Sequence, residues 1–152
     1  MPPKVRLATE PDLPRIVELL AQLAPDDPGR EDTSSPLPYD YHLVFREMAA
    51  GRQQLFVAES RGKIIGTLVV IIVPNLSHRA TPYAIIENVV VDAKHRSKGV
   101  GEALIARAVE EARNAGCYKV SLTSNKRRTD AHRFYERQGF EQSHAAFRIT
   151  LE

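Results

Sequence analysis

The sequence predicts a mixed α/β sheet, and the pattern of its apolar residues carries this prediction. The first half contains four apolar or alternating runs typical of strands, at residues 4–8, 54–59, 64–73 and 83–92. The second half contains two segments of helical periodicity, residues 98–115 and 129–138, with a further apolar run at 117–124 between them. Strands that follow one another and then alternate with helices indicate a sheet with a parallel crossover in its C-terminal half.

Two more helices are expected between the first and second strands. Apolar residues spaced for one buried face predict a helix within residues 9–23, with Asp12 as its N-cap. A loop rich in Pro, Asp and Ser follows at 24–38, and a second helix covers 39–50 and ends at Gly51.

The remaining elements complete the predicted order. Residues 60–63 form a hairpin turn, and the almost wholly apolar run 64–73 is typical of a central strand. The helix at 129–138 is expected to be capped by Thr129 or Asp130, and the alternating run 140–151 to form a last strand. The order is therefore β-α-α-β-β-β-α-β-α-β, in a single domain covering residues 1–152.

The overall composition excludes several classes of protein. The 152 residues are 43% hydrophobic and 26% charged, which is ordinary for a globular domain. Cys117 is the single cysteine and cannot form an internal disulfide, and no apolar run approaches a membrane span, so a cytoplasmic protein is expected. A net charge of +2 is too small to indicate a nucleic acid or membrane partner, and no ligand spacing indicates a metal.

The stretch HRSKGVGEALI, residues 95–105, predicts an anion site between a strand and a helix. Its glycines allow close approach to the backbone, the amides of Ser97 to Glu102 begin a helix, and Arg96 and Lys98 add positive charge. A pyrophosphate suits these groups. The spacing matches neither a P-loop nor a GxGxxG fingerprint. The alternative is a tight turn beside a solvated basic pair.

A longer stretch that includes this loop resembles the GCN5-related N-acetyltransferase (GNAT) family. The resemblance lies in VVVDAKHRSKGVGEALIARAVEEARNAG, with Arg96, Gly99 and Gly101, followed by LTSN and AHRFYERQGF, and covers about residues 85–142. It implies the GNAT-like acyl-CoA N-acyltransferase fold, with acetyl-CoA as donor. Its pyrophosphate would then bind the amides of Ser97, Lys98, Gly99, Val100, Gly101 and Glu102, and its pantetheine arm would follow Val89, Val90 and Val91, beside which the sheet splays.

Two residues are candidates for catalysis, Tyr135 from the resemblance and Glu87 from its place in the strand. Tyr135 resembles the phenol that gives a proton to the departing thiolate, since an ordinary phenol pKa of about 10 keeps it protonated at neutral pH. The alternative is a ring that packs beside Phe134 and Phe140. Glu87 interrupts an apolar strand and is the candidate general base, on the same face as Val89 and Val91 by alternation. The alternative is an ion pair or a solvated strand end.

Other polar residues are second choices for the same chemistry. His132 and His144 are alternative bases, because histidine titrates near neutral pH. Asn125 could bind the pantetheine or adenine side, and Arg128, with Lys126 and Arg127, could hold the 3′-phosphate of CoA or simply be solvated. Cys117 lies in a buried strand without a base positioned for it, so direct transfer in a ternary complex is expected.

The acceptor is expected to be a primary amine of a small molecule. Local likeness to glucosamine-6-phosphate and to aminoalkylphosphonate N-acetyltransferases points in two directions. The acidic loop, with Asp26, Asp27, Glu31 and Asp32, would suit a cationic polyamine or aminoglycoside if it faced the cleft. The acceptor, the base and the oligomeric state stay open, a homodimer included. The alternative function is a non-catalytic acyl-CoA-binding or regulatory module.

Overall fold

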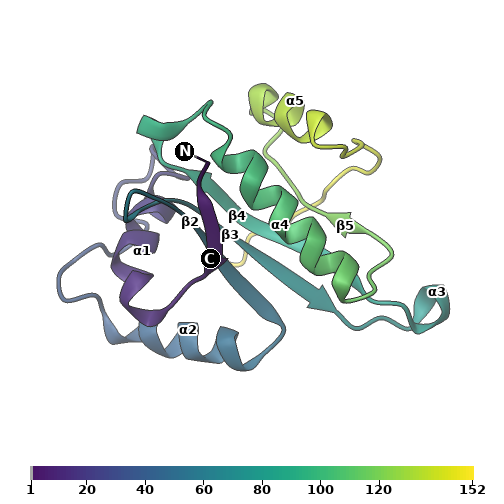
Figure 1. The fold of residues 1–152 in the computed structure, drawn as a ribbon, viewed down its shortest axis with the longest axis horizontal. Helices are drawn as coiled ribbons and strands as arrows, with labels where there is room; N and C mark the ends of the chain where they lie inside the picture. Colours follow the sequence, from purple (N-terminus) through teal and green to yellow (C-terminus); the bar gives the residue numbers. More distant parts are fainter. Residues whose placement is uncertain (1) are drawn as a thin grey trace.

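The computed structural model describes residues 2–152, which build a five-stranded mixed sheet in the order β1-β2-β3-β4-β5 (Figure 1). Neighbours from β1 to β4 are antiparallel, and β5 lies parallel to β4 after a crossover through α4. The predicted mixed sheet with a parallel crossover is confirmed. The strands are β1 (Lys4–Leu7), β2 (Gln53–Ser60), β3 (Lys63–Val73), β4 (Tyr83–Val91) and β5 (Val120–Ser121).

The helices cover both faces of this sheet (Figure 1). Helix α4 packs on one face, in the core cluster that contains Phe56 and Leu68, and α1 packs on the other with Val57 and Val90. Helix α2 lies beside α1 and none of its residues is buried. The helical elements are η1 (Glu10–Asp12), α1 (Leu13–Ala21), α2 (Tyr39–Ala50), the short α3 (Ser77–Ala80), η2 (Ala93–His95), α4 (Val100–Asn114) and α5 (Thr129–Arg137).

Strand β3 is the central strand, as its apolar sequence predicts. Its residues from Ile64 to Val70 are all buried, because helices cover both faces. Gly66 allows α4 to approach: a Cβ there would lie 3.0 Å from Leu104 Cδ1 and 3.0 Å from Val100 Cγ1. The start of α4 is therefore fixed against the middle of the sheet. Within the described residues, no helix is both long enough and apolar enough to cross a bilayer.

Of the predicted helix caps, Asp12 is confirmed, and Thr129 or Asp130 is wrong. Asp12 is the N-cap residue of α1, but its side chain makes no capping hydrogen bond. It also ends η1, and its carboxylate accepts hydrogen bonds from the Thr9 amide at 2.7 Å and from Arg6 Nη1 at 2.7 Å. The helical segment thus starts at Glu10, before the expected cap. Thr129 and Asp130 both lie inside α5, whose N-cap is Arg128.

The predicted last strand, residues 140–151, is also wrong. This segment follows α5 without pairing to any strand of the described chain, and its side chains are exposed apart from the half-buried Phe140. Alternation alone does not make a strand. The two edges of the sheet, β1 and β5, span only four and two residues, so neither offers a long row of free backbone groups. Strand β5 is likewise shorter than the predicted 117–124.

Candidate active site

Strands β4 and β5 separate soon after they meet. They pair only at Ala84 with Val120 and at Ile85 with Ser121. From Ile86 onward, the backbone groups of β4 that point away from β3 have no neighbouring strand. The splay expected from the resemblance is therefore present, and it opens a cavity of about 170 Å³, the strand cleft, lined by Leu23, Ile86, Glu87, Asn88, Val89, Leu122, Thr123, Arg128 and Tyr135.

Tyr135 enters the strand cleft from α5. Its ring is 8% exposed and makes edge contacts with Phe134 and Phe140, at centroid distances of 5.3 and 6.0 Å. Burial raises the pKa of the phenol, and the positive charge of Arg128 opposes this shift. The hydroxyl therefore stays protonated at neutral pH. Tyr135 therefore has two features at once: it packs in the core cluster and it lines the strand cleft.

Glu87 lies on the opposite face of β4 from the one expected. Val69 pairs with Glu87 and Thr67 pairs with Val90, so β4 carries one residue more than β3 between these two pairs. This bulge is at Asn88, whose φ is +55°. Residues directly opposite one another share a face, so Glu87 shares that of Val69, toward α1 and α2.

The bulge therefore separates Glu87 from its neighbours along β4. Val89 and Val91 pack toward α4, whereas Val90 is buried against α1. The prediction of one shared face assumed unbroken alternation and is wrong. Glu87 is exposed and still lines the strand cleft.

The segment Arg96–Gly99 forms a short loop before α4. Ser97 and Gly99 have positive φ, +63° and +80°, and Gly99 is the N-cap of α4. Within the helix, the first amide to bind a helical carbonyl is that of Ala103, which donates to Gly99 O at 3.1 Å. The preceding amides, Gly99 to Glu102, have no acceptor in the helix and suit an anion. Arg96 and Lys98 are exposed, and Arg96 Nε donates to Val91 O at 3.4 Å.

Gly101 serves helix packing rather than the turn. A Cβ at this position would lie 3.1 Å from Phe134 Cζ, so α5 approaches the first turn of α4 at this point. The sequence prediction gave both glycines of the loop the same task of admitting a ligand. The structure separates them, because Gly99 supplies the left-handed conformation and Gly101 supplies space for Phe134.

Asp92 fixes the start of the loop to α1, and sequence reasoning missed it. This buried carboxylate accepts hydrogen bonds from Arg15 Nη2 at 3.0 Å and Gln22 Nε2 at 3.3 Å, and lies 3.2 Å from His95 Nδ1. Burial would raise the pKa of Asp92, but these hydrogen bonds, the Lys94 amide and the Arg15 charge lower it to about 2. An acidic residue directly after an apolar strand was the available signal.

The other candidate side chains divide between cleft and surface. Arg128 lines the strand cleft, whereas Asn125 Oδ1 accepts from the Arg127 amide at 2.9 Å in the turn before α5. His132 Nε2 is 2.8 Å from Asn125 O, and His144 Nδ1 is 2.7 Å from the adjacent Ser143 Oγ. Neither histidine is among the residues that line a cavity described here.

The acidic loop and Cys117 also lie away from the strand cleft. The strand cleft is not lined by Asp26, Asp27, Glu31 or Asp32, and neither is a larger cavity on the α1 and α2 side of the sheet. The loop is held to α2 instead, since the Tyr41 hydroxyl donates to Glu31 Oε1 at 3.2 Å and accepts from the Asp32 amide at 3.0 Å. Cys117 packs beside the core, and burial raises the pKa of its thiol.

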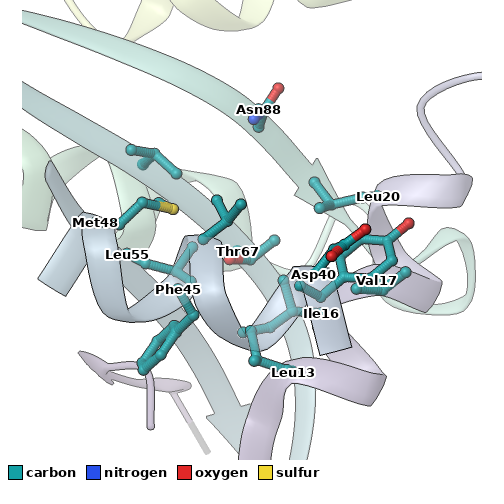
Figure 2. A pocket seen from close by; sticks show the side chains of 13 residues that line it. Leu13, Ile16, Val17, Leu20, Asp40, Phe45, Met48, Leu55, Thr67 and Asn88 are labelled. Carbon is teal, nitrogen blue, oxygen red and sulfur yellow. The ribbon is translucent and has the colours of Figure 1, made fainter. Parts of the chain in front are cut away.

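A second, larger cavity lies on the α1 and α2 side of the sheet (Figure 2). We call it the apolar cavity. Its volume is about 350 Å³. Asn88 lines both this cavity and the strand cleft, so the two spaces are neighbours at the β4 bulge. Sequence reasoning did not identify it. The residues that line it are Leu13, Ile16, Val17 and Leu20 of α1, Asp40, Tyr41, Val44, Phe45 and Met48 of α2, and Leu55, Thr67, Val69 and Asn88 of the sheet.

The mixed sheet with its separated β4 and β5 has the fold of an acyl-CoA N-acyltransferase, and comparison with known proteins identifies the family. The model of the Acetyltransferase (GNAT) family matches residues 15–140, which is most of the chain. The protein belongs to this family and is an acetyl-CoA-dependent N-acetyltransferase.

Individual relatives are similar over different lengths. A glucosamine 6-phosphate N-acetyltransferase of Trypanosoma brucei brucei is 31% identical over 97% of this chain and 95% of its own. An aminoalkylphosphonate N-acetyltransferase of Salmonella typhimurium is 43% identical, over 49% of this chain and 48% of its own. Among solved structures, a protein of Bacillus halodurans described as a transcriptional regulator superimposes with a TM-score of 0.90 at 36% identity, covering 98% of this chain and 99% of that one.

Proposed function

We propose that the enzyme moves the acetyl group of acetyl-CoA directly to a primary amine of a small molecule in a ternary complex, with Tyr135 as general acid and Glu87 as general base. The observation that carries the proposal is that both residues line the strand cleft, next to Asn88. A protonated phenol and an exposed carboxylate thus lie at one cavity, and this cavity shares Asn88 with a second.

The residues present fit the coenzyme. The amides at the start of α4 have no helical acceptor, the free edge of β4 has no strand partner, and Ser124 Oγ is buried without a hydrogen-bond partner in the described chain. We assign the pyrophosphate to the amides of Ser97–Glu102 with Arg96 and Lys98, and the pantetheine arm to the backbone of Val89–Val91. Arg128 is assigned to a phosphate of CoA and Asn125 to its pantetheine or adenine side.

The side chains of the cleft then manage the protons of the transfer. Bound acetyl-CoA supplies the acetyl group as an activated thioester. Glu87 takes the proton that the amine nitrogen loses as the new N–C bond forms. Tyr135 Oη gives its proton to the sulfur as the C–S bond breaks. Direct transfer needs no protein nucleophile, which agrees with the place of Cys117, since it lines neither cavity and its pKa is raised.

The proposal is tested by following thiol release from acetyl-CoA over a panel of amines. In Tyr135→Phe we expect kcat to fall about 100-fold, the usual range for a lost general acid, with the Kd for CoA in calorimetry unchanged. Tyr118→Phe is the matched control, because Tyr118 is exposed and lines neither cavity. Undiminished turnover in Tyr135→Phe would exclude the role of general acid.

Regulation through bound acyl-CoA, in addition to acetyl transfer, is the second candidate function. The Bacillus halodurans protein described as a transcriptional regulator favours it, since it is similar over nearly the whole chain. Calorimetry with CoA tests this function, and absence of CoA binding would exclude it.

We also propose a homodimer in which the C-terminal segment pairs with the partner. Phe147, Ile149 and Leu151 are 94%, 83% and 92% exposed, so this segment presents three apolar side chains that a partner would cover. Light scattering should give the mass of a dimer for the natural protein. The variant with Ser at all three positions should give that of a monomer. A monomeric natural protein would exclude the dimer.

A further inference from the structure

The apolar cavity gives the acceptor side of the enzyme a definite chemistry. We propose that the natural acceptor is a primary amine carried on a hydrophobic body, an alkyl or aryl group without phosphate, phosphonate or sugar. This inference rests on the proposed function, since it names the substrate class of the same site.

The cavity is placed to deliver an amine to the strand cleft. Figure 2 shows Asn88 on β4 at one side of the cavity, with apolar side chains of α1 and α2 gathered away from it. Because Asn88 lines both spaces, an amine at this end reaches the cleft while the body stays among Phe45, Met48 and Leu55. The volume of about 350 Å³ is within the range of small-molecule sites, ~300–1,000 Å³.

The polar groups of the cavity are few, and two of them are already bound. The Thr67 hydroxyl donates to Phe56 O at 2.7 Å, and the Tyr41 hydroxyl binds Glu31 and Asp32 in the loop. Asn88 and Asp40 are the remaining polar side chains of the lining. A sugar would bring several hydroxyl groups into a cavity with almost no partners for them, which is unfavourable.

The charge of the lining excludes an anionic substrate more firmly. No lysine or arginine is among the described residues that line the cavity, and its one charged side chain is the exposed Asp40 of α2. A phosphate or phosphonate would be desolvated without a counter-charge. A protonated amine, in contrast, is attracted by Asp40 on its way in. The substrate class therefore differs from those in the names of the Trypanosoma and Salmonella relatives.

Helix α2 is poorly covered by the rest of the chain, and a bound ligand would cover it further. No residue of α2 is buried, and Val44, which lines the cavity, is 53% exposed. A hydrocarbon body in the cavity would cover Val44, Phe45 and Met48 and supply the packing that α2 lacks. Binding should therefore stabilise the protein as well as position the amine.

The experiment compares amines that differ in the body attached to nitrogen. The probes are hexylamine and 2-phenylethylamine against glucosamine 6-phosphate, 2-aminoethylphosphonate, spermidine and kanamycin, with thiol release giving kcat/KM. We expect the two apolar amines to exceed the others by at least about 10-fold, the scale on which a hydrophobic pocket discriminates. A higher kcat/KM for a phosphate, phosphonate, polyamine or aminoglycoside probe would overturn the inference while leaving the transfer itself established.

A binding measurement separates this inference from the proposed function. Hexylamine should raise Tm in the presence of CoA, and 2-aminoethylphosphonate should leave it unchanged. A rise without turnover would contradict the proposed transfer to this amine but support the apolar site. No rise with hexylamine and no turnover would overturn both.

Variants of α2 place the effect in the cavity. Met48→Ala should raise KM for 2-phenylethylamine about 10-fold with little change in kcat, whereas Leu43→Ala is the control, since Leu43 is on the same helix but does not line the cavity. Met48→Arg should lower KM for 2-aminoethylphosphonate and raise it for 2-phenylethylamine. Unchanged kinetics in both folded Met48 variants would contradict the assignment.

Discussion

Val69 and Glu87 lie opposite one another across β3 and β4, although Thr67, two residues earlier on β3, pairs with Val90 and not with Asn88 or Val89. The extra residue of β4 turns Glu87 toward α1 and α2 and leaves Val89 and Val91 toward α4. The candidate base therefore lies on the acceptor side of the strand, and the backbone that follows lies along the free edge assigned to the coenzyme. In the proposed mechanism, this bulge separates the acceptor side of β4 from the coenzyme side.

Replacing Glu87 tests this division. Glu87→Gln keeps the size of the side chain and removes its ability to take a proton, so we expect kcat to fall about 100-fold. The KM for acetyl-CoA should hardly change, because Glu87 faces the acceptor side. Steady-state kinetics on the natural protein, on Glu87→Gln and on the surface control Glu110→Gln check this. Full activity in Glu87→Gln would move the base to a water chain or another residue.

The backbone at Asn88 provides a prediction about stability. Its φ of +55° is accessible to Asn and Gly but strained for a β-branched residue. Asn88→Val should therefore lower the free energy of unfolding by about 1–2 kcal/mol, whereas Asn88→Gly should stay within about 0.5 kcal/mol of the natural protein. Urea denaturation measures both. Equal stability of the two variants would show that the bulge is not held by this conformation.

The helices and the central strands could be predicted from the sequence because each obeys a local rule. Periodicity places α4, and the uninterrupted apolar run places β3 in the middle of the sheet. The loop before α4 could be predicted because a left-handed residue before a helix is usually glycine, and Gly99 is visible in the sequence. Tyr135 could be predicted in the same way, because it lies within the sequence motif that forms α5.

Other features depend on contacts that no local pattern records. The face on which Glu87 lies depends on the bulge in β4. Strict alternation of side chains predicts the wrong face, because it does not include the extra residue. The last strand fails because pairing needs an edge, which the sequence of 140–151 does not contain. The apolar cavity is made by α1, α2 and three strands together, and its residues look like ordinary core in the sequence. Asp92 is anchored by residues 70 and 77 positions away in the chain.

Gly101 and Phe134 predict a coupling between helix packing and catalysis. Gly101→Ala adds a Cβ only 3.1 Å from Phe134 Cζ, so Phe134 must give way by a few tenths of an ångström. We expect this shift to move α5 and Tyr135 as well. The gain in helix propensity, about 1 kcal/mol, offsets part of the clash, so Tm should change little while kcat falls several-fold. In the Phe134→Leu background the clash is absent, so Gly101→Ala should lower kcat much less than it does in the natural protein. Additive losses in this double-mutant cycle would contradict the coupling.

Asp92 predicts an acid limb in the stability of the fold. Its pKa is about 2 in the folded protein, below its ordinary value of 3.8, so the folded state holds the ionised carboxylate more strongly than the unfolded chain does. The resulting stabilisation is fully present above about pH 5 and is lost as the pH falls through 3.8 toward 2, because there the unfolded state binds the proton first. In Asp92→Asn this contribution disappears. The free energy of unfolding from urea titrations between pH 2.5 and about 6 should therefore depend less on pH in the variant.

Because Arg15 loses a buried partner, Tm of the variant at pH 7 should also fall, by about 3–10 °C. Asp130→Asn is the matched control, since that carboxylate is fully exposed on α5. An unchanged pH dependence in Asp92→Asn would mean that the link between α1 and the loop does not rest on this charge.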